Sequence, residues 1–140
     1  MTPKQIDLVQ SSFAKVAAIA DIAAELFYKR LFELDPSIRS MFATDMTEQR
    51  KKLMASLGMV VGNLRNLERI VPGVKAMAVR HSGYGVRNYH YAVVGEALID
   101  TLGKGLGPDF TDDVREAWLA AYTVLANTMK AAAEEAEVAA

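Results

Sequence analysis

Apolar residues recur every three or four positions along most of the chain, the spacing that places them on one face of a helix. The first stripe follows Thr2-Pro3-Lys4-Gln5, a capping-box pattern with proline in the first turn, which predicts a helix start. The positions expected to face the core are Ile6, Val9, Phe13, Val16, Ile22, Leu26, Phe27, Leu31, Leu53, Leu57, Val60, Val61, Leu64, Tyr91, Val94, Leu98, Leu102, Val114, Trp118, Ala121, Tyr122, Leu125 and Met129.

Proline, glycine and capping residues divide these stripes into separate helices. Breaks are expected at Asp35-Pro36, Pro72-Gly73, Gly83 with Gly85, and the cluster Gly103, Gly105, Gly107 and Pro108. Thr47 and Thr111 then cap the third long helix and the last one, and the Ala/Glu-rich tail over 131–140 is expected to fray. With no alternating segment that indicates a strand, the prediction is one all-α domain over 1–140 with about seven or eight helices.

Composition narrows the class of protein. Hydrophobic residues make up 51% of the 140 residues, charged residues make up 24%, and the net charge of −1 excludes the basic excess of a nucleic-acid-binding surface. The absence of cysteine excludes disulfides, iron–sulfur clusters and cysteine-linked haem. No apolar run resembles a signal peptide or a membrane span, so we expect a cytoplasmic protein.

The stretch from Lys75 to Val86 carries the first candidate for chemistry, His81, which precedes Gly83 and Gly85. An imidazole at the end of a stiff turn can ligate a metal. It can equally be a cation that stabilises a helix C-terminus, and these residues alone leave both interpretations open. The other histidine, His90, has no histidine or carboxylate at i+4 to share a metal, and we interpret it as structural.

A wider pattern resembles the bacterial single-domain globins, which are related to the haem domain of flavohaemoglobins. The match extends from the first helix to about Met129 and includes Phe-Tyr-x-x-Leu-Phe at 27–32, Arg80-His81 and Val94-Gly95-Glu96. The ordered residues that carry it are Tyr28, Phe42, Gln49, Leu53, His81, Tyr91, Trp118 and Tyr122. The resemblance implies a globin fold, with helices packed three-over-three around a haem pocket.

The resemblance also implies roles for individual residues around a non-covalent haem b. His81 corresponds to the proximal ligand of the iron, and Tyr28 and Gln49 correspond to distal donors that stabilise a bound gas. For Tyr28 the alternative is a core tyrosine whose hydroxyl meets a backbone carbonyl. The other residues expected at the cofactor are Phe42, Leu53, Val86, Tyr91, Val94 and Lys52, with Arg80 as a further cation for the propionates.

Three functions are consistent with such a pocket. The first is reversible binding of dioxygen and other diatomic gases, with high oxygen affinity and a role such as oxygen transport. The second is nitric oxide dioxygenation or peroxidase-like turnover with electrons from an external reductase, although Ala133 stands where flavohaemoglobins place a glutamate behind the proximal histidine. In those proteins a tyrosine at the position of Tyr91 shares this proximal environment. The third is a gas sensor that acts through a partner protein.

Overall fold

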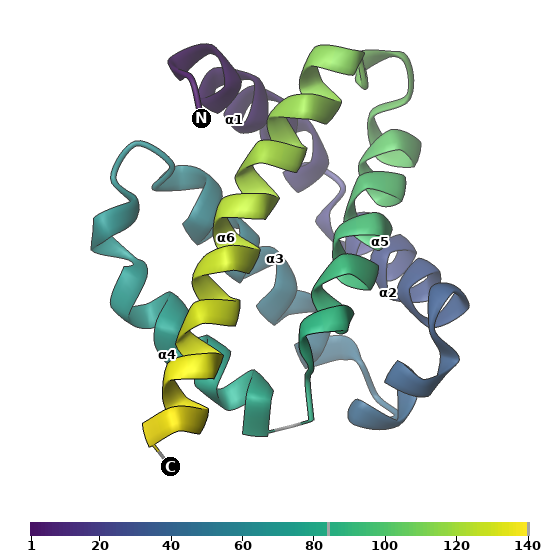
Figure 1. Cartoon of the computed structure of the whole chain (residues 1–140). Coiled ribbons are helices and arrows are strands. Elements are labelled where there is room, and N and C mark those ends of the chain that lie inside the picture. The colour runs from purple at the N-terminus through teal and green to yellow at the C-terminus, as the bar shows by residue number, and fades with distance from the viewer. Residues whose placement is uncertain (84, 140) are drawn as a thin grey trace.

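The structure, a computed structural model, describes residues 1–83 and 85–139 and consists there of helices joined by short links, with no strand in those ranges (Figure 1). The helices are α1 (Pro3–Ala17), α2 (Ala20–Leu34), η1 (Pro36–Met41), α3 (Thr47–Gly62), η2 (Leu67–Arg69), α4 (Val71–Gly83), α5 (Asn88–Leu106), η3 (Gly107–Asp109) and α6 (Asp112–Ala139), where η marks a 3-10 helix. The all-α prediction is confirmed. Within these ranges no helix is both long enough and apolar enough to span a membrane.

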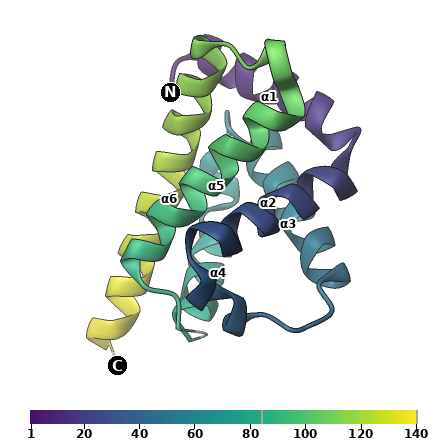
Figure 2. The same ribbon diagram turned by 90° about the vertical axis from the view of Figure 1, so that its right-hand side faces the viewer.

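Two packed groups of helices build the molecule. In Figure 1 helix α6 crosses the front of the molecule from the top to the lower left and packs against α4 and α1, while α5 packs against α2. In Figure 2, turned by 90°, η1 and the link to α3 lie below α2 and α3, and α4 lies across from that link. The lower half of the molecule is therefore framed by α2, η1, α3, α4 and the start of α5.

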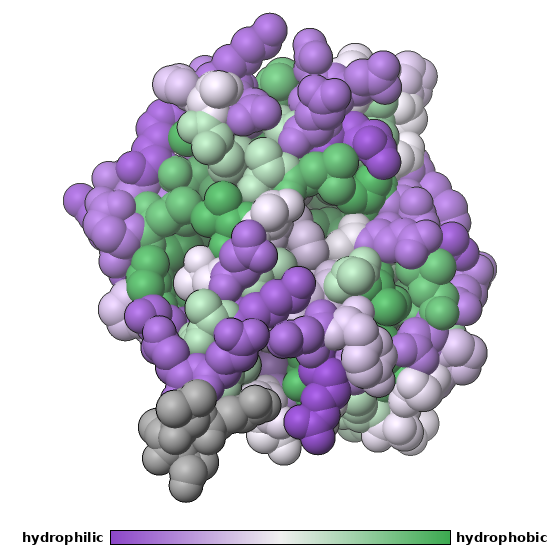
Figure 3. Space-filling model, viewed as in Figure 1, coloured by the Kyte–Doolittle hydropathy of each residue, from purple (hydrophilic) through white to green (hydrophobic). Residues whose placement is uncertain are grey.

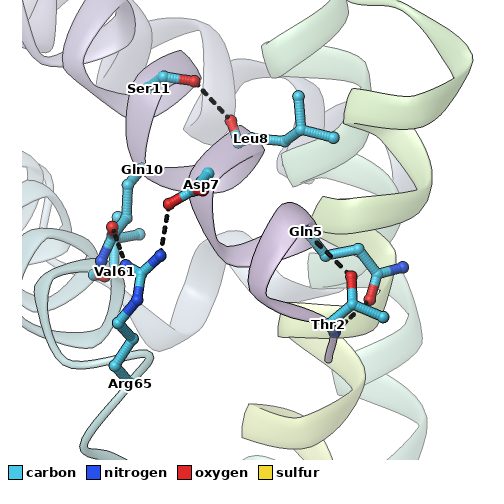
Figure 4. Close-up of polar contacts among 8 residues, drawn as sticks. All are labelled: Thr2, Gln5, Asp7, Leu8, Gln10, Ser11, Val61 and Arg65. Atoms are coloured by element: carbon cyan, nitrogen blue, oxygen red, sulfur yellow. Dashed lines mark hydrogen bonds and ion pairs between the residues drawn. The ribbon is translucent and has the colours of Figure 1, made fainter.

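Polar contacts anchor α1 to the far end of α3 (Figure 4). Thr2 and Gln5 form the expected capping box, in which each side chain bonds the other residue's backbone N–H. The guanidinium of Arg65 donates to Gln10 at 2.8 Å and pairs with Asp7, while the amide of Gln10 donates to the carbonyl of Val61 at 3.0 Å. The bonds of Gln10 and Arg65 join α1 to the end of α3 and to the link that follows it.

The helix breaks predicted at two glycine-containing stretches exist, but the helices end and begin at other residues than these stretches suggested. Helix α5 continues through Gly103 and Gly105 and ends at Gly107, where φ is 56°. A glycine inside a helix costs about 0.5–1 kcal/mol without forbidding the helix, whereas a positive φ ends it. Helix α4 already begins at Val71, because a proline in the first turn removes only an N–H that has no partner in the helix.

Helix α2 buries Phe27 and Leu31 as predicted, whereas Ile22, predicted to face the core, lies on the surface. Ile22 is 56% exposed, whereas Ala23 and Ala24 are 3% and 1% exposed and face the core together with Phe27 and Leu31. The small alanine side chains let α2 approach its neighbours closely, and this turns the helix so that Ile22 points outward.

The ends of α3 and α6 differ in part from the prediction. The α3 N-cap is Met46 rather than Thr47, and Asp45 accepts the N–H of Thr47 at 2.9 Å. Thr111 does cap α6, since its hydroxyl accepts the N–H of Val114 at 3.3 Å. The tail that was expected to fray is described as helix up to Ala139.

Candidate functional site

Tyr28 on α2 and Gln49 on α3 meet in the lower half of the molecule. The amide nitrogen of Gln49 donates to the phenol oxygen of Tyr28 at 3.1 Å. Since Tyr28 accepts this bond, its own O–H proton remains available for another acceptor. Tyr28 is 6% exposed, and burial raises its pKa, against a smaller lowering by the Gln49 bond. The phenol is therefore a neutral donor at physiological pH.

Aromatic rings hold Tyr28 in place. Its ring lies edge-on to Phe42 with centroids 5.5 Å apart, and Phe27 and Phe32 are at 5.0 and 6.0 Å. The guanidinium of Arg39 lies 5.3 Å above Phe32 and donates to the carbonyl of Phe42 at 3.1 Å, which ties the link after η1 to α2. Phe42 and Leu53 are both half-buried against the core.

His81 lies in the last turn of α4 and is half-buried. Its Nδ1 is 2.7 Å from the carbonyl oxygen of Met77, one turn earlier. A carbonyl can only accept, so Nδ1 carries the proton, and in the neutral ring this leaves the Nε2 lone pair for a ligand. A ligating histidine needs this kind of support for its ring.

The chain then turns back sharply after His81. The N–H of Val86 bonds the carbonyl of His81 at 3.0 Å, and the N–H of Gly85 bonds that of Ser82 at 3.1 Å. Gly85 has φ of 93°, so this is a Schellman turn in which only Gly85, and not Gly83, needs to be glycine. The turn brings Val86, which is half-buried, back beside the last turn of α4 that carries His81.

Helix α5 contributes Tyr91 and Val94. The hydroxyl of Tyr122 donates to the carbonyl of Tyr91 at 2.6 Å, and Lys130 Nζ lies 5.9 Å from the centre of the Tyr91 ring. Burial raises the pKa of Tyr91 and raises that of Tyr122 further. Tyr91 was expected to support His81, but the partner that the structure gives to the imidazole N–H is the Met77 carbonyl.

Three further predicted residues are placed as follows. Lys52 and Arg80 are exposed, and neither forms an ion pair among the described residues. His90 is 3% exposed and its Nδ1 accepts the N–H of Arg87 at 2.8 Å, which caps the start of α5. His90 stands three residues after Arg87, the spacing of a capping box, and this spacing in the sequence indicates the cap.

These residues fit a haem. His81 offers Nε2 as a ligand for the iron. Tyr28 offers a buried O–H that donates to no other group among the described residues. The half-buried side chains of Phe42, Leu53, Val86 and Val94 offer the apolar contacts that a flat macrocycle needs. An apolar cavity of about 50 Å³ lies elsewhere, between α3, η2, α4 and α6, and is lined by residues such as Val60, Leu67 and Leu125.

The helical arrangement, with His81 on α4 and the bonded pair Tyr28 and Gln49 on α2 and α3, is the arrangement of the globin class of haem proteins. Comparison with known families agrees, because the Globin family model matches residues 25–129. The chain belongs to the globin family.

Relatives and solved structures refine this placement. The chain is 34% identical over 134 residues to a flavohemoprotein of Xylella fastidiosa and 30% identical over 132 residues to one of Vibrio cholerae. These two alignments cover 92% and 90% of this chain. It spans about a third of the length of these relatives, 33% in each case.

Two solved structures have nearly the same fold. A bacterial globin from Campylobacter jejuni has a TM-score of 0.88 at 26% identity, covering 97% of this chain and 99% of that one. An engineered carbene transferase from Rhodothermus marinus, a candidate nitric oxide dioxygenase, has a TM-score of 0.89 at 26% identity, covering 99% and 97%. The expected resemblance to bacterial single-domain globins and flavohaemoglobin haem domains is confirmed.

Proposed function

We propose that this globin binds haem b through His81 Nε2 and binds dioxygen reversibly with high affinity, and other diatomic gases as well. Haem held by a single histidine supplies an iron with one open position for a gas. Phe42, Leu53, Val86 and Val94 would contact the macrocycle, with Tyr91 below it and Lys52 or Arg80 near its propionates.

The hydrogen bond from Gln49 to Tyr28 is the observation that carries the oxygen-binding proposal. A bound haem would supply electron density to the gas, and the buried O–H of Tyr28 would stabilise the resulting negative charge by donating to it. Because the Gln49 amide donates to the phenol oxygen, the Tyr28 O–H points away from α3. The same bond polarises the phenol and makes its O–H a stronger donor. The burial of Tyr28 keeps water from competing for that proton. Tyr28 therefore acts directly and Gln49 acts through it.

Stopped-flow dissociation of dioxygen from the ferrous protein tests this division of roles. Tyr28→Phe should raise the dissociation rate about 10- to 100-fold, the value of one hydrogen bond to a charged acceptor. Gln49→Leu should raise it less, because Tyr28 keeps its O–H. Tyr89→Phe, which removes a hydroxyl from a residue that is 60% exposed, is the matched control and should change nothing. Equal rates in all four proteins would refute the distal mechanism.

The haem assignment has its own test. His81→Ala should abolish the ferrous carbon monoxide spectrum of a histidine-ligated haem, and free imidazole should restore it by occupying the vacated position. If His81→Ala kept the wild-type spectrum, the iron ligand would have to be another residue.

Nitric oxide dioxygenation with an electron donor is the second candidate. It is favoured by the similarity to flavohemoproteins and to the Rhodothermus candidate nitric oxide dioxygenase. Ala133 and the Met77 acceptor argue for weak electron donation to the iron, because a neutral carbonyl makes the imidazole less basic than a carboxylate would. Nitrate formed over many cycles with NADPH and a flavoprotein reductase would support an enzyme, whereas one stoichiometric burst would support a binding protein.

A further inference from the structure

One arginine side chain holds the link between η1 and α3, residues 42–46. The guanidinium of Arg39 donates to three successive carbonyls of this link, those of Phe42 at 3.1 Å, Ala43 at 3.0 Å and Thr44 at 3.3 Å. Within residues 1–83 and 85–139, these are the only side-chain bonds to a carbonyl of the link. A guanidinium carries several N–H donors in a rigid plane, so this one side chain fixes the path of the backbone.

Both ends of the link reach Tyr28. At one end the Phe42 ring lies 5.5 Å from the Tyr28 ring, and at the other end α3 begins and carries Gln49, whose amide donates to the Tyr28 oxygen at 3.1 Å. The rings of Tyr28, Phe32 and Phe42 form a triangle with centroids 5.5 to 6.0 Å apart. Arg39 also covers this triangle, because its guanidinium lies 5.3 Å from the centre of the Phe32 ring. A shift of the link would therefore move both neighbours of Tyr28.

The other bonds of the link lie at its ends. The N–H of Phe42 bonds the carbonyl of Arg39 at 3.2 Å, and the carboxylate of Asp45 accepts the N–H of Thr47 at 2.9 Å. Residues 43–45 are exposed. No carboxylate competes for the guanidinium, since Arg39 forms no ion pair in the part of the chain that the structure describes. Loss of its three bonds would leave the middle of the link to water alone.

We propose that Arg39 is a positioning residue for gas binding, which holds the link so that Tyr28 and Gln49 keep the arrangement in which the Tyr28 O–H faces the gas. The proposal rests on the proposed function above and names a residue that controls it. Arg39 acts through Phe42 and the start of α3, not by touching the gas. A hydrogen bond weakens steeply when its angle or distance leaves the optimum, so a small displacement of the link weakens gas binding while every distal donor is still present.

Dissociation of dioxygen from the ferrous, haem-loaded protein tests the proposal. Arg39→Met removes all the donors and keeps an unbranched apolar stem beside Phe32. It should raise the dissociation rate about 3- to 10-fold, less than Tyr28→Phe does, because the Tyr28 O–H is displaced and not lost. Arg39→Lys keeps the charge but cannot bond three carbonyls with one planar group, so its rate should lie between those of wild type and Arg39→Met.

The double variant of Arg39→Met with Tyr28→Phe tests the route of the effect. If Arg39 acts through Tyr28, its substitution should change the dissociation rate less than about twofold once the phenol O–H is absent. The C–O stretching frequency of the carbon monoxide complex responds to a donor beside the bound gas, and it should shift in Arg39→Met in the same direction as in Tyr28→Phe. Equal fold-changes with and without the Tyr28 hydroxyl would refute the proposal.

Arg65 is the matched control, because its guanidinium also ties a link to a neighbouring helix. It bonds Gln10 and Asp7 from the link after α3, which lies at the upper left of Figure 1, whereas η1 lies at the lower right. Hydrophilic side chains line that upper left edge in Figure 3, and the Arg65 side chain is 47% exposed. Arg65→Met should leave the dissociation rate within about twofold of wild type. If both arginine variants accelerated dissociation equally, general loosening of the fold would explain the effect and the proposal would fail.

Hydrogen exchange gives a readout that needs no gas. Amides of residues 42–49 should exchange faster in Arg39→Met, and those of residues 61–66 in Arg65→Met. An unchanged rate of exchange over 42–49 would show that Arg39 does not hold the link.

The outcomes also separate this proposal from the proposed function. A wild-type protein without the spectrum of a histidine-ligated haem would refute the haem assignment, and an unchanged rate in Tyr28→Phe would refute the distal mechanism. If Tyr28→Phe accelerates dissociation while Arg39→Met and Arg39→Lys keep the wild-type rate, the role of Arg39 alone is refuted.

Discussion

At the scale of single residues, one buried hydrogen-bond chain joins the two ends of the protein. Trp118 on α6 is 3% exposed, and its indole N–H donates to the hydroxyl of Ser12 on α1 at 2.8 Å. Ser12, 6% exposed, in turn donates to the carbonyl of Leu8 at 2.6 Å. A buried indole N–H left without an acceptor costs about 1–3 kcal/mol, more than the bond itself contributes, so the Ser12 hydroxyl stabilises the packing of α1 against α6.

Removing the Ser12 hydroxyl should therefore destabilise the fold. We expect Ser12→Ala to lower the free energy of unfolding by about 1–3 kcal/mol, measured by urea denaturation, because Trp118 loses its acceptor. Ser11 is the matched control, since its hydroxyl also bonds the Leu8 carbonyl, at 3.3 Å, but at the exposed surface (Figure 4). Ser11→Ala should stay within about 0.5 kcal/mol. Equal losses in the two variants would mean that Trp118 finds another acceptor.

At the scale of helices, α6 approaches α5 closely at Gly95. A Cβ built on Gly95 would lie 2.7 Å from Tyr122 Cε2, closer than real Cβ contacts. The missing side chain lets the Tyr122 ring lie against α5, where its hydroxyl reaches the Tyr91 carbonyl. Gly95, noted in the sequence only as part of a family motif, thus positions the first turns of α5.

Two glycine-to-alanine substitutions in α5 should have opposite signs. At Gly103 an added Cβ meets Phe110 at an ordinary 3.5 Å, so Gly103→Ala should stabilise by about 0.5–1 kcal/mol through helix propensity. Gly95→Ala gains the same propensity but displaces the Tyr122 ring, and a net loss of about 1–3 kcal/mol is expected. Thermal unfolding of both variants measures the difference. A stabilised Gly95→Ala protein would show that Tyr122 can move aside freely.

At the scale of the whole molecule, tyrosines with raised pKa values in the core couple folding to alkaline pH. Burial is the main cause of the raised pKa for Tyr28, Tyr91 and Tyr122. The unfolded chain releases these protons near the usual tyrosine pKa of about 10, while the folded chain still holds them. The folded state binds more protons in that range, so its stability falls as the pH rises above about 10 and is fully retained below it.

The slope of stability against pH measures this coupling. Denaturant unfolding between pH 8 and pH 11 should show little change up to about pH 9.5 and then a decline that approaches about 1.4 kcal/mol per pH unit for each fully buried tyrosine. Tyr122→Phe should reduce the decline, whatever its effect on stability at neutral pH. Tyr89→Phe should leave the decline unchanged, because that side chain is in water in both states. If the stability of Tyr122→Phe fell just as steeply with pH, the pH dependence would have to come from other groups.

Most of the helices and the order of the site residues could be predicted from the sequence. Helical stripes and stops are local, so Pro3, Asp35 and Gly85 mark boundaries without knowledge of the fold. Local signals failed where packing outweighed them, as in the continuation of α5 through Gly103 and the exposure of Ile22. A cost of about 1 kcal/mol at one glycine is small against the burial of a whole helix face.

By itself, the sequence determined an all-α domain with a histidine in the last turn of one helix and a tyrosine and a glutamine placed as in globins. Only the tertiary structure decided that Gln49 donates to Tyr28 across 21 residues of chain, that Met77 holds the His81 proton, and that Gly95 admits Tyr122. Such choices depend on side-chain distances of about 3 Å, which are set by how helices pack. Helical spacing determines which face a residue occupies, but the atom it meets depends on the neighbouring helix.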